Sequence, residues 1–537
     1  MLEEIRRGKL RVPKFQRPFV WRPEKMLELF VSIYKGYPIG SPLIWESADP
    51  VRSLDVVGPI AVPQAGVKPV SYILDGHQRL ATLFGVLFLP EDYARTEKQQ
   101  DWRWWIFFDP ESKGFVHVPK GPPHDRYIPL RAMFNTRDFL EVARTIEQSC
   151  GDKASDYISE MEELSSKLTN YKLAVTRIIG GSLDQAVNIF SRLNTSGQSM
   201  MPDQMVSALT YDDAMGDKTL AGTIDDILES LQEFQFDTIN RITVFRAIVA
   251  ASGKSIHKSD WEALAEELKK TDLNEAAEKT KAALRSSALF LNVFLKVPMD
   301  RLLPYTHQIL LLSEFFRMCP EPDSYQEDLL KKWFWSTSLS GWFAGNGGNT
   351  TQLNYGLGEM RELAGYQQTG FNGFKIMSVD DPARPFPNRF DLRAARIRAL
   401  LLFMLLLEPL DPETGTPLQA DQVFRGPGTS ALPYVFHRAP GGLTSSPANR
   451  VFLRTIQGRP AKVQLLGVYD ELRQKVLESH CISEEAFHAL QNDDARCFIE
   501  TRAKDLERSE REFMVSLGLT LPKETGYAEP DIDTGED

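Results

Sequence analysis

The sequence has few cysteines and no long apolar run, and both shortages limit what the protein can be. Its 537 residues include four cysteines, at positions 150, 319, 481 and 497, and none stand in C-x-x-C spacing. A disulfide framework or a structural zinc site is therefore not expected, and a reducing, cytoplasmic location fits best. The most apolar stretch, Ala399–Leu407, is too short to cross a bilayer. We expect a buried core helix there and no membrane partner.

The chain also lacks an overall excess of basic residues. Its formal net charge is −11, which argues against a protein coated in basic surface for nucleic acid. The first 40 residues differ, because their Lys and Arg outnumber the four Glu by five. A local basic face is enough to contact DNA, so this segment is a candidate DNA surface. Its nine basic residues are Arg6, Arg7, Lys9, Arg11, Lys14, Arg17, Arg22, Lys25 and Lys35.

The pattern of apolar residues predicts an α+β protein with a mixed N-terminal domain and mainly helical middle and C-terminal domains. Short strand-like runs alternate with helical patterns in the first part, whereas residues 205–345 read as nearly all helix. A proline-rich stretch at 380–390 is typical of a domain boundary. The expected divisions are residues 1–205, 206–385 and 386–520, followed by an acidic, disordered tail at 521–537.

Two local expectations concern the N-terminal domain. Leu2, Ile5 and Leu10 share one side of an amphipathic pattern, which predicts a helix from the first residues to near Pro13. The runs at 102–110 and 114–119 predict two strands joined by a turn. Alternation in the first of these strands favours core packing of its tryptophans over stacking on nucleic-acid bases.

The stretch "SYILDGHQRLATLFGVL", residues 71–87, places a polar cluster at a strand-to-helix junction. A strand-like run ends at Asp75-Gly76, and His77, Gln78 and Arg79 follow before an apolar helical pattern starts at position 80. A helix start offers free backbone N–H groups, and Arg79 adds a forked donor for phosphate. Asp75 suits Mg²⁺ held against phosphate oxygens, and Gly76 lets the backbone approach a ligand. The cluster predicts a pocket for a nucleoside triphosphate.

Two further clusters supply donors, and a simpler interpretation exists. Gln16, Arg17 and Lys25 stand in "FQRPFVWRPEK", and Arg192 and Asn194 stand in "FSRLNTSG". In the simpler interpretation Asp-Gly is an ordinary turn, the aspartate caps the helix, and the arginine four residues later pairs with it. The histidine of the junction is either a general base or a capping residue. The sequence has no G-x-x-x-x-G-K-[ST] loop and is not a P-loop NTPase.

Taken in order, "VPKFQRPFVW", "YILDGHQRLATL" and "AVNIFSRLNTSGQ" resemble the N-terminal domain of the GmrSD-type defence proteins, a family with SspE-like members. The resemblance covers about 200 residues. It implies a ParB/sulfiredoxin-like fold that binds a nucleoside triphosphate with Mg²⁺ and hydrolyses it at a D-G-Q-Q-R motif. By this resemblance the catalytic residues are Asp75, His77, Gln78 and Arg79. The nucleotide contacts are Gln16, Arg17, Gly76, Arg192 and Asn194. His77 replaces the first Gln of the motif, which puts hydrolysis rate and base preference in question.

Members of this family often carry a C-terminal HNH-type nuclease with a D-H-I-x-P-like motif and an Asn about 20 residues later. Here "LPYVFHRAPGGLTSSPANRVFLRT" resembles that layout and supplies Asn449. Pro433 and Tyr434 occupy the acid and histidine positions, and His437 lies where the proline should be. The resemblance therefore implies a degenerate nuclease domain that serves packing, DNA binding or partner docking. The alternative keeps His437 as a displaced catalytic base acting with Asn449.

The sequence thus leaves three functional hypotheses. The first is an NTP-hydrolysing component of a prokaryotic defence system that switches DNA engagement or a separate nuclease subunit. The second is a self-contained, metal-dependent DNA nuclease with an atypical C-terminal site. The third is a non-enzymatic adaptor that senses nucleotide. Self-association into a homo-oligomer is left open.

Overall fold

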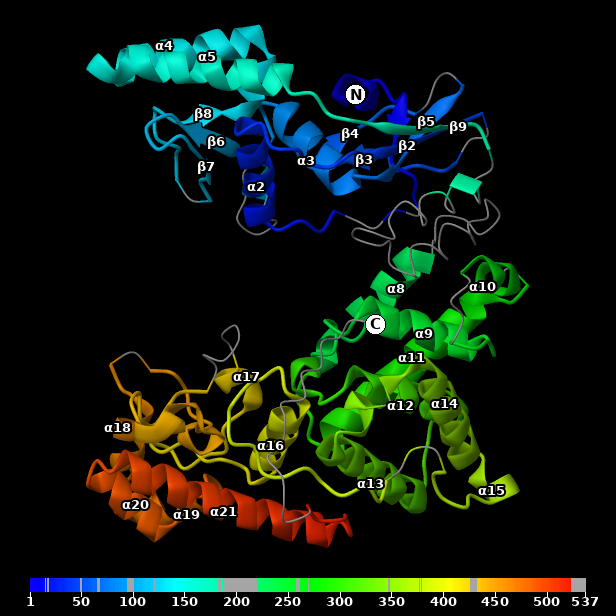
Figure 1. Ribbon diagram of the computed structural model, residues 1–537, viewed down its shortest axis with the longest axis vertical. Helices are drawn as coiled ribbons and strands as arrows, with labels where there is room; N and C mark the ends of the chain where they lie inside the picture. Colours follow the sequence, from blue (N-terminus) through cyan, green and yellow to red (C-terminus); the bar gives the residue numbers. More distant parts are fainter. Residues whose placement is uncertain are drawn as a thin grey trace. The chain divides into compact units, whose positions relative to one another are not determined.

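The computed structural model describes most of residues 1–522 (Figure 1). The positions it leaves undescribed within that range are 15, 17–18, 49–50, 65–67, 94–100, 120, 182–184, 187–188, 190–219, 257–260, 269, 346–347, 376, 378, 425–431 and 457. The chain divides into two compact units, Met1–Gly222 with Trp261–Glu266 and Thr223–Asp260 with Glu267–Asp537. The sheets lie in the first unit and the second is helical, so the mixed α/β character predicted for the chain is confirmed. The ParB/sulfiredoxin-like topology and the predicted domain boundaries stay predictions.

The main sheet of the first unit has the strand order β1-β5-β2-β9. Strand β5 is central, and it pairs parallel with β1 and antiparallel with β2. Strand β2 in turn pairs parallel with β9. The register shifts between Leu43 and Ile44, so the antiparallel pairing becomes irregular where β5 ends at Asp75. The strands are β1 (Leu10–Arg11), β5 (Val70–Asp75), β2 (Leu43–Ser47) and β9 (Thr176–Ile179).

Helix α3 (His77–Leu87) follows β5 directly and packs on this sheet. Its Leu80 and Phe84 share a buried cluster with Ile44 and Ile73 of the strands and with Ile5 of helix α1 (Leu2–Arg6). Each of these five side chains is at most 1% exposed. Burial of such a side chain contributes about 1.5–3 kcal/mol. The contacts fix the first turn of α3 against the end of the central strand.

A second core holds the rest of the first unit together around a small sheet with the order β7-β6-β8. Phe30, Phe108 and Met161 are fully buried in it. Its elements are α2 (Pro23–Tyr34), β6 (Ile106–Asp109), β7 (Gly114–His117), β8 (Ile128–Pro129), α4 (Thr136–Ser149) and α5 (Ala154–Asn170). A hairpin of β3 (Val56–Val57) and β4 (Ile60–Ala61) completes the strands described in this unit.

The predicted first helix is wrong beyond Arg6. Gly8 adopts a φ of +70°, and a Cβ there would lie 2.5 Å from the carbonyl oxygen of Pro63. The chain therefore leaves the helix at this glycine, and Leu10–Arg11 joins the sheet as β1. Sequence periodicity gave no sign of this, because alternating and helical patterns agree over so short a stretch.

The predicted strand at 102–110 is also partly wrong. Residues Asp101–Trp104 form a 3₁₀ turn, and only Ile106–Asp109 is extended. Trp104 is 3% exposed and packs so closely on Gly85 that a Cβ there would lie 2.6 Å from its ring. Core packing of this tryptophan is therefore confirmed, although its backbone is not a strand.

The second unit is built from helices (Figure 1). Helices α11, α12, α14 and α9 pack together, and the apolar run at Ala399–Leu407 lies largely in α16, whose buried residues confirm the predicted core helix. No described helix is long and apolar enough to cross a membrane. The helices that follow β9 are α8 (Leu220–Glu229), α9 (Arg241–Ala251), α10 (Trp261–Leu268), α11 (Leu273–Val293), α12 (Thr306–Met318), α13 (Ser324–Ser340), α14 (Thr350–Ala364), α15 (Tyr366–Thr369), α16 (Ala395–Leu406), α17 (Ala420–Val423), α18 (Ala461–Leu466), α19 (Asp470–Ser479), α20 (Glu484–Gln491) and α21 (Ala495–Ser516).

Helices α16 and α21 are joined by a buried ion pair. Arg396 Nη1 donates to Glu510 Oε1 at 2.7 Å, and Nη2 donates to Oε2 at 2.5 Å. The two side chains are 6% and 2% exposed, so water cannot solvate either charge if the other is removed. Such pairs cost desolvation energy when they form, and losing one partner strands the other.

We predict that Arg396→Met lowers the free energy of unfolding by about 3–5 kcal/mol, because Glu510 is then left buried and unpaired. The double variant Arg396→Met/Glu510→Leu should recover most of the loss. Lys279→Met is the matched control, because Lys279 pairs with Glu275 at 2.7 Å on the exposed face of α11. Urea denaturation measures all three. A single variant no less stable than the double one would contradict the prediction.

Candidate functional site

The junction between β5 and α3 is shaped by a glycine in a left-handed conformation. Gly76 precedes the helix with φ +87° and ψ 8°, and a Cβ there would lie 3.1 Å from Pro42 Cβ and 3.3 Å from Arg79 Nη2. Only glycine adopts this conformation without strain in so tight a place. Helix α3 starts at His77, three residues earlier than the apolar pattern predicted. The polar residues of the junction are therefore part of the first turn of the helix.

Arg79 connects three parts of this junction. Its Nη2 donates to Asp75 Oδ2 at 3.0 Å, and its Nη1 donates to the carbonyl oxygen of Ile39 at 2.6 Å. Gly40 lies directly beneath the guanidinium with φ +80°, where a Cβ would overlap Arg79 Nη1. The predicted pairing of Arg79 with Asp75 is confirmed. Capping of α3 by the aspartate is not observed, because the N-cap position is occupied by Gly76, which has no side chain.

Two glutamines join the N-terminal motif to the junction. Gln16 Nε2 donates to the carbonyl oxygen of Leu74 at 2.8 Å, and Gln78 Oε1 accepts from the backbone N–H of Val20 at 2.9 Å. Gln16 therefore lies beside the end of β5, and Val20 beside the first turn of α3. The structure thus brings together Gln16, Gly76, Gln78 and the Asp75–Arg79 pair, from two of the three predicted clusters.

The remaining nucleotide contacts are placed differently. Lys25 lies on α2, where it is 58% exposed and pairs with Glu28 at 2.8 Å. Arg17, Arg192 and Asn194 lie outside the described residues, so their predicted contacts stay predictions.

The accessible side chains of the junction are the acid and the arginine. Asp75 is 39% exposed and Arg79 is 20% exposed, whereas His77 and Gln78 are buried at 5% and 7%. A ligand arriving from solvent meets the carboxylate first, with a guanidinium beside it and the start of an 11-residue helix behind it. This combination suits a phosphate-bearing anion that arrives with a divalent cation.

A metal ion at this place would need more ligands than the described residues supply. Among the described residues, no group of three or more His, Cys, Asp or Glu side chains is arranged to hold a metal ion. Asp75 is a single carboxylate, and Mg²⁺ commonly binds through one or two carboxylates with phosphate oxygens and waters completing its shell. The donor set fits Mg²⁺ that is brought in with a phosphate ligand.

Sequence reasoning missed the segment that faces Arg79. The carbonyl of Ile39 and the open space at Gly40 hold the guanidinium, and Pro42 packs against Gly76. The signal was present in "GYPIGSP", where two glycines and two prolines stand within seven residues. Nothing in the sequence said that this turn meets the D-G-H-Q-R motif.

The basic N-terminal segment places fewer of its charges on the surface than its composition predicted. Arg11 is 2% exposed, and its guanidinium bonds Ser53 Oγ at 2.7 Å, Asp55 Oδ1 at 3.3 Å and the carbonyl oxygen of Pro63. This arginine braces the residues around β3 and β4 and does not face solvent, so its place in a DNA surface was wrong. Arg6 and Arg7 are exposed, and both pair with Glu3.

In the C-terminal region, Asn449 acts as an internal brace. It is fully buried, and its Nδ2 donates to the carbonyl oxygens of Phe436 and Thr444 at 2.9 and 3.0 Å. Its Oδ1 accepts from the N–H of Phe436 at 2.9 Å. Asn449 therefore fixes the backbone beside His437, whose own side chain is exposed.

Tyr434, which the resemblance aligned with the histidine of an HNH motif, makes a cation–aromatic contact. The Arg450 guanidinium lies 3.4 Å from the ring centroid of Tyr434, and the two residues form an isolated antiparallel bridge. Burial lowers the pKa of Arg450. His437 meets the same tyrosine ring edge-on at 6.1 Å. The catalytic use of His437 and Asn449 stays a prediction.

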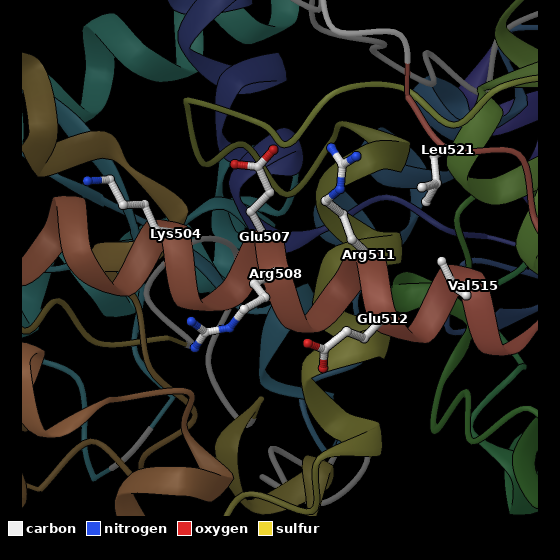
Figure 2. A pocket seen from close by; sticks show the side chains of 7 residues that line it. All are labelled: Lys504, Glu507, Arg508, Arg511, Glu512, Val515 and Leu521. Atoms are coloured by element: carbon white, nitrogen blue, oxygen red, sulfur yellow. The ribbon is translucent and has the colours of Figure 1, made fainter.

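A hollow of about 580 Å³ runs along α21. Figure 2 shows Lys504, Glu507 and Arg511 rising from one side of the helix, and Arg508 and Glu512 from the other. The charges of both signs come from one helix and do not converge. The arrangement is typical of an exposed helix face stabilised by neighbouring opposite charges.

Comparisons with known proteins agree with the N-terminal resemblance. Residues 1–211 match the family described as "GmrSD restriction endonuclease, N-terminal domain". The chain is also 22% identical, over 402 residues, to the uncharacterized protein MJ0686 of Methanocaldococcus jannaschii. That alignment covers 64% of this chain, and the chain spans 64% of the relative's length. The family match ends before the second unit and supports a GmrSD-type assignment for the part that contains the Asp75–Arg79 junction.

Proposed function

We propose that the protein is a nucleoside triphosphate-binding and hydrolysing component of a prokaryotic restriction-type defence system. The observation that supports this best is the position of Asp75 and Arg79 at a strand–helix junction, within the residues that match a restriction endonuclease domain. The nucleotide state then controls engagement of DNA or the activity of a separate nuclease subunit.

Each accessible group of the junction has a task in this proposal. The backbone N–H groups at the start of α3 and the Arg79 guanidinium bind phosphate oxygens. Asp75 holds the cation side of the ligand and orients the attacking water. Mg²⁺ bound between Asp75 and the phosphates would neutralise charge on the leaving phosphate. His77 and Gln78 are buried, so we assign them to positioning the first turn.

The junction also offers a route from nucleotide to the N-terminal segment. A phosphate that draws on Arg79 competes with Asp75 and with the carbonyl of Ile39 for the same guanidinium. Gln78, in the first turn of α3, accepts a hydrogen bond from the backbone N–H of Val20. Val20 belongs to the basic N-terminal segment that is proposed to contact DNA. Nucleotide binding and DNA binding would thus share one small set of hydrogen bonds, which is the physical requirement for coupling them.

We predict that Asp75→Asn lowers phosphate release by about 100-fold or more, because the neutral amide loses the cation and the water-orienting carboxylate. The assay uses four ribonucleoside triphosphates with Mg²⁺, with and without DNA. Asp152→Asn is the matched control, since Asp152 is exposed on the turn between α4 and α5. Equal turnover in the two variants would show that the Asp75 carboxylate has no role in hydrolysis.

Nucleotide binding without turnover would point to the sensing adaptor instead. A calorimetric titration of the unaltered protein with the same nucleotides distinguishes the two. We expect binding together with phosphate release. Nucleotide binding without phosphate release under any condition would reject hydrolysis and support a site that only binds nucleotide.

We predict that His77→Gln keeps phosphate release within about threefold and leaves its pH profile unchanged near neutral pH. The imidazole is buried, and glutamine is the residue that the related motif carries at this position. Removal of a general base typically costs about 10²–10⁴-fold and removes a limb of the pH profile. A loss of that size would assign His77 a direct role in the reaction.

A further inference from the structure

A second hollow, of about 820 Å³, opens within the helical unit. Its lining comes from separate stretches of the chain at residues 238–240, 300–306, 391–393 and 398. The volume lies in the range of small-molecule sites. Unlike the hollow along α21, which is lined by one helix and Leu521, this one gathers side chains that are far apart in the sequence.

Arg398 forms a rigid, positively charged part of the wall. Its Nε donates to the carbonyl oxygen of Leu392 at 2.9 Å, and its Nη2 donates to that of Arg393 at 2.8 Å. Its Nη1 donates to the carbonyl oxygens of Leu303 and Pro304 at 2.9 and 3.2 Å. These bonds hold the backbone on two sides of the hollow and keep a guanidinium charge beside it.

Arg301 and Arg393 are exposed residues that line the same hollow. Arg301 donates from Nη2 to the carbonyl oxygen of Phe424 and from Nε to Met299 Sδ at 2.9 Å. Arg393 donates from Nε and Nη2 to the two carboxylate oxygens of Asp391, at 3.1 and 2.7 Å. These bonds use Nε and Nη2 of each guanidinium, and each guanidinium also carries two N–H donors on Nη1.

The two acids of the lining are engaged with protein donors. Both oxygens of Asp391 accept from Arg393, which holds the pKa of that carboxyl below its usual range. Asp300 Oδ2 accepts from the N–H and the hydroxyl of Thr238 at 2.8 and 2.7 Å. Burial raises the pKa of Asp300 above its usual value. Three guanidinium charges outweigh the two carboxylates.

We propose that this hollow binds a phosphate group through Arg301 and Arg393, with Arg398 as the fixed charge of its wall. Paired guanidinium forks recognise phosphate oxygens with directional hydrogen bonds. Thr306 begins the 13-residue helix α12 at the edge of the hollow, and the positive end of that helix adds attraction of the same sign. The phosphate comes either from a free nucleotide or from a nucleic-acid backbone. The site is independent of the junction at Asp75.

The test uses the full-length protein with the first unit unaltered in every sample, so that any phosphate binding there is the same throughout. Inorganic pyrophosphate is titrated calorimetrically without Mg²⁺, and a short DNA duplex is titrated by fluorescence anisotropy at several salt concentrations. We expect Arg301→Gln/Arg393→Gln to weaken binding of at least one probe by about tenfold or more. The control is Arg285→Gln/Arg473→Gln.

The control removes the same charge from the same unit without touching the hollow. Arg285 bonds the carbonyl oxygen of Ser230 at 2.8 Å and lies 5.4 Å from the Phe234 ring, much as Arg301 bonds and covers Phe424. Arg473 pairs with Asp470 on an exposed helix, much as Arg393 pairs with Asp391. A general loss of charge affects both double variants alike.

The outcomes separate the sources of the phosphate. Weaker pyrophosphate binding in the pocket variant alone confirms a site for a free phosphate ligand. Unchanged pyrophosphate binding with weaker DNA binding and a smaller salt slope confirms a backbone contact. If neither probe distinguishes the pocket variant from the control, the proposal is overturned.

Thr306→Asp provides a second variant that does not remove a structural arginine. An aspartate in the first turn suits the start of α12, so the helix is retained. The same negative charge at the edge of the hollow repels phosphate, and binding should fall as in the double variant. If Thr306→Asp binds both probes as well as the unaltered hollow does, with thermal stability unchanged, the proposed phosphate site is contradicted.

Discussion

One guanidinium group, that of Arg79, links the predicted site to the sheet of the first unit. It joins the end of the central strand, through Asp75, to the turn that carries Ile39 and Gly40. Both ends of the turn matter for the sheet, since β2 begins just beyond it and pairs with β5 through an irregular register at Asp75 itself. The carbonyl oxygen of Ile39 lies outside the strands, and this guanidinium supplies it with a donor that the sheet does not.

The same solution recurs at several other loops of the described chain. Buried or half-buried arginines donate to carbonyl oxygens of loops that have no strand or helix to satisfy them. Arg502 is fully buried and bonds the carbonyl oxygens of Ala448, Arg450 and His480. Burial lowers the pKa of Arg502 to about 10, which keeps it charged at neutral pH. Burial, with this charge nearby, lowers the pKa of His480 to about 4, so that imidazole is neutral.

The sequence predicted the parts of the site that lie in one continuous motif, and it failed where the chain folds back. The strand, the glycine and the polar first turn at Asp75–Arg79 follow from local pattern, and so does the buried helix α16. The turn at Gly40 and the inward position of Arg11 depend on residues about 40 or more positions away. Composition counted Arg11 as surface charge, because nothing local distinguishes a brace from a solvated arginine. Asn449, assigned to a nuclease by resemblance, is committed to three backbone bonds that only the folded loop reveals.

Magnitudes explain how Arg79 can serve both the fold and a ligand, while Arg396 cannot. The Asp75–Arg79 pair is 39% and 20% exposed, and a solvent-accessible ion pair contributes about 0–1 kcal/mol. A phosphate, with more charge and more acceptor oxygens than one carboxylate, can take a share of that guanidinium at small cost. Arg396 and Glu510 are almost fully buried, and separating them would strand a charge at about 3–5 kcal/mol. Both proposed ligand sites therefore use accessible arginines, Arg79 in the first unit and Arg301 and Arg393 in the second, because an exchange of partners there costs little enough to be reversible.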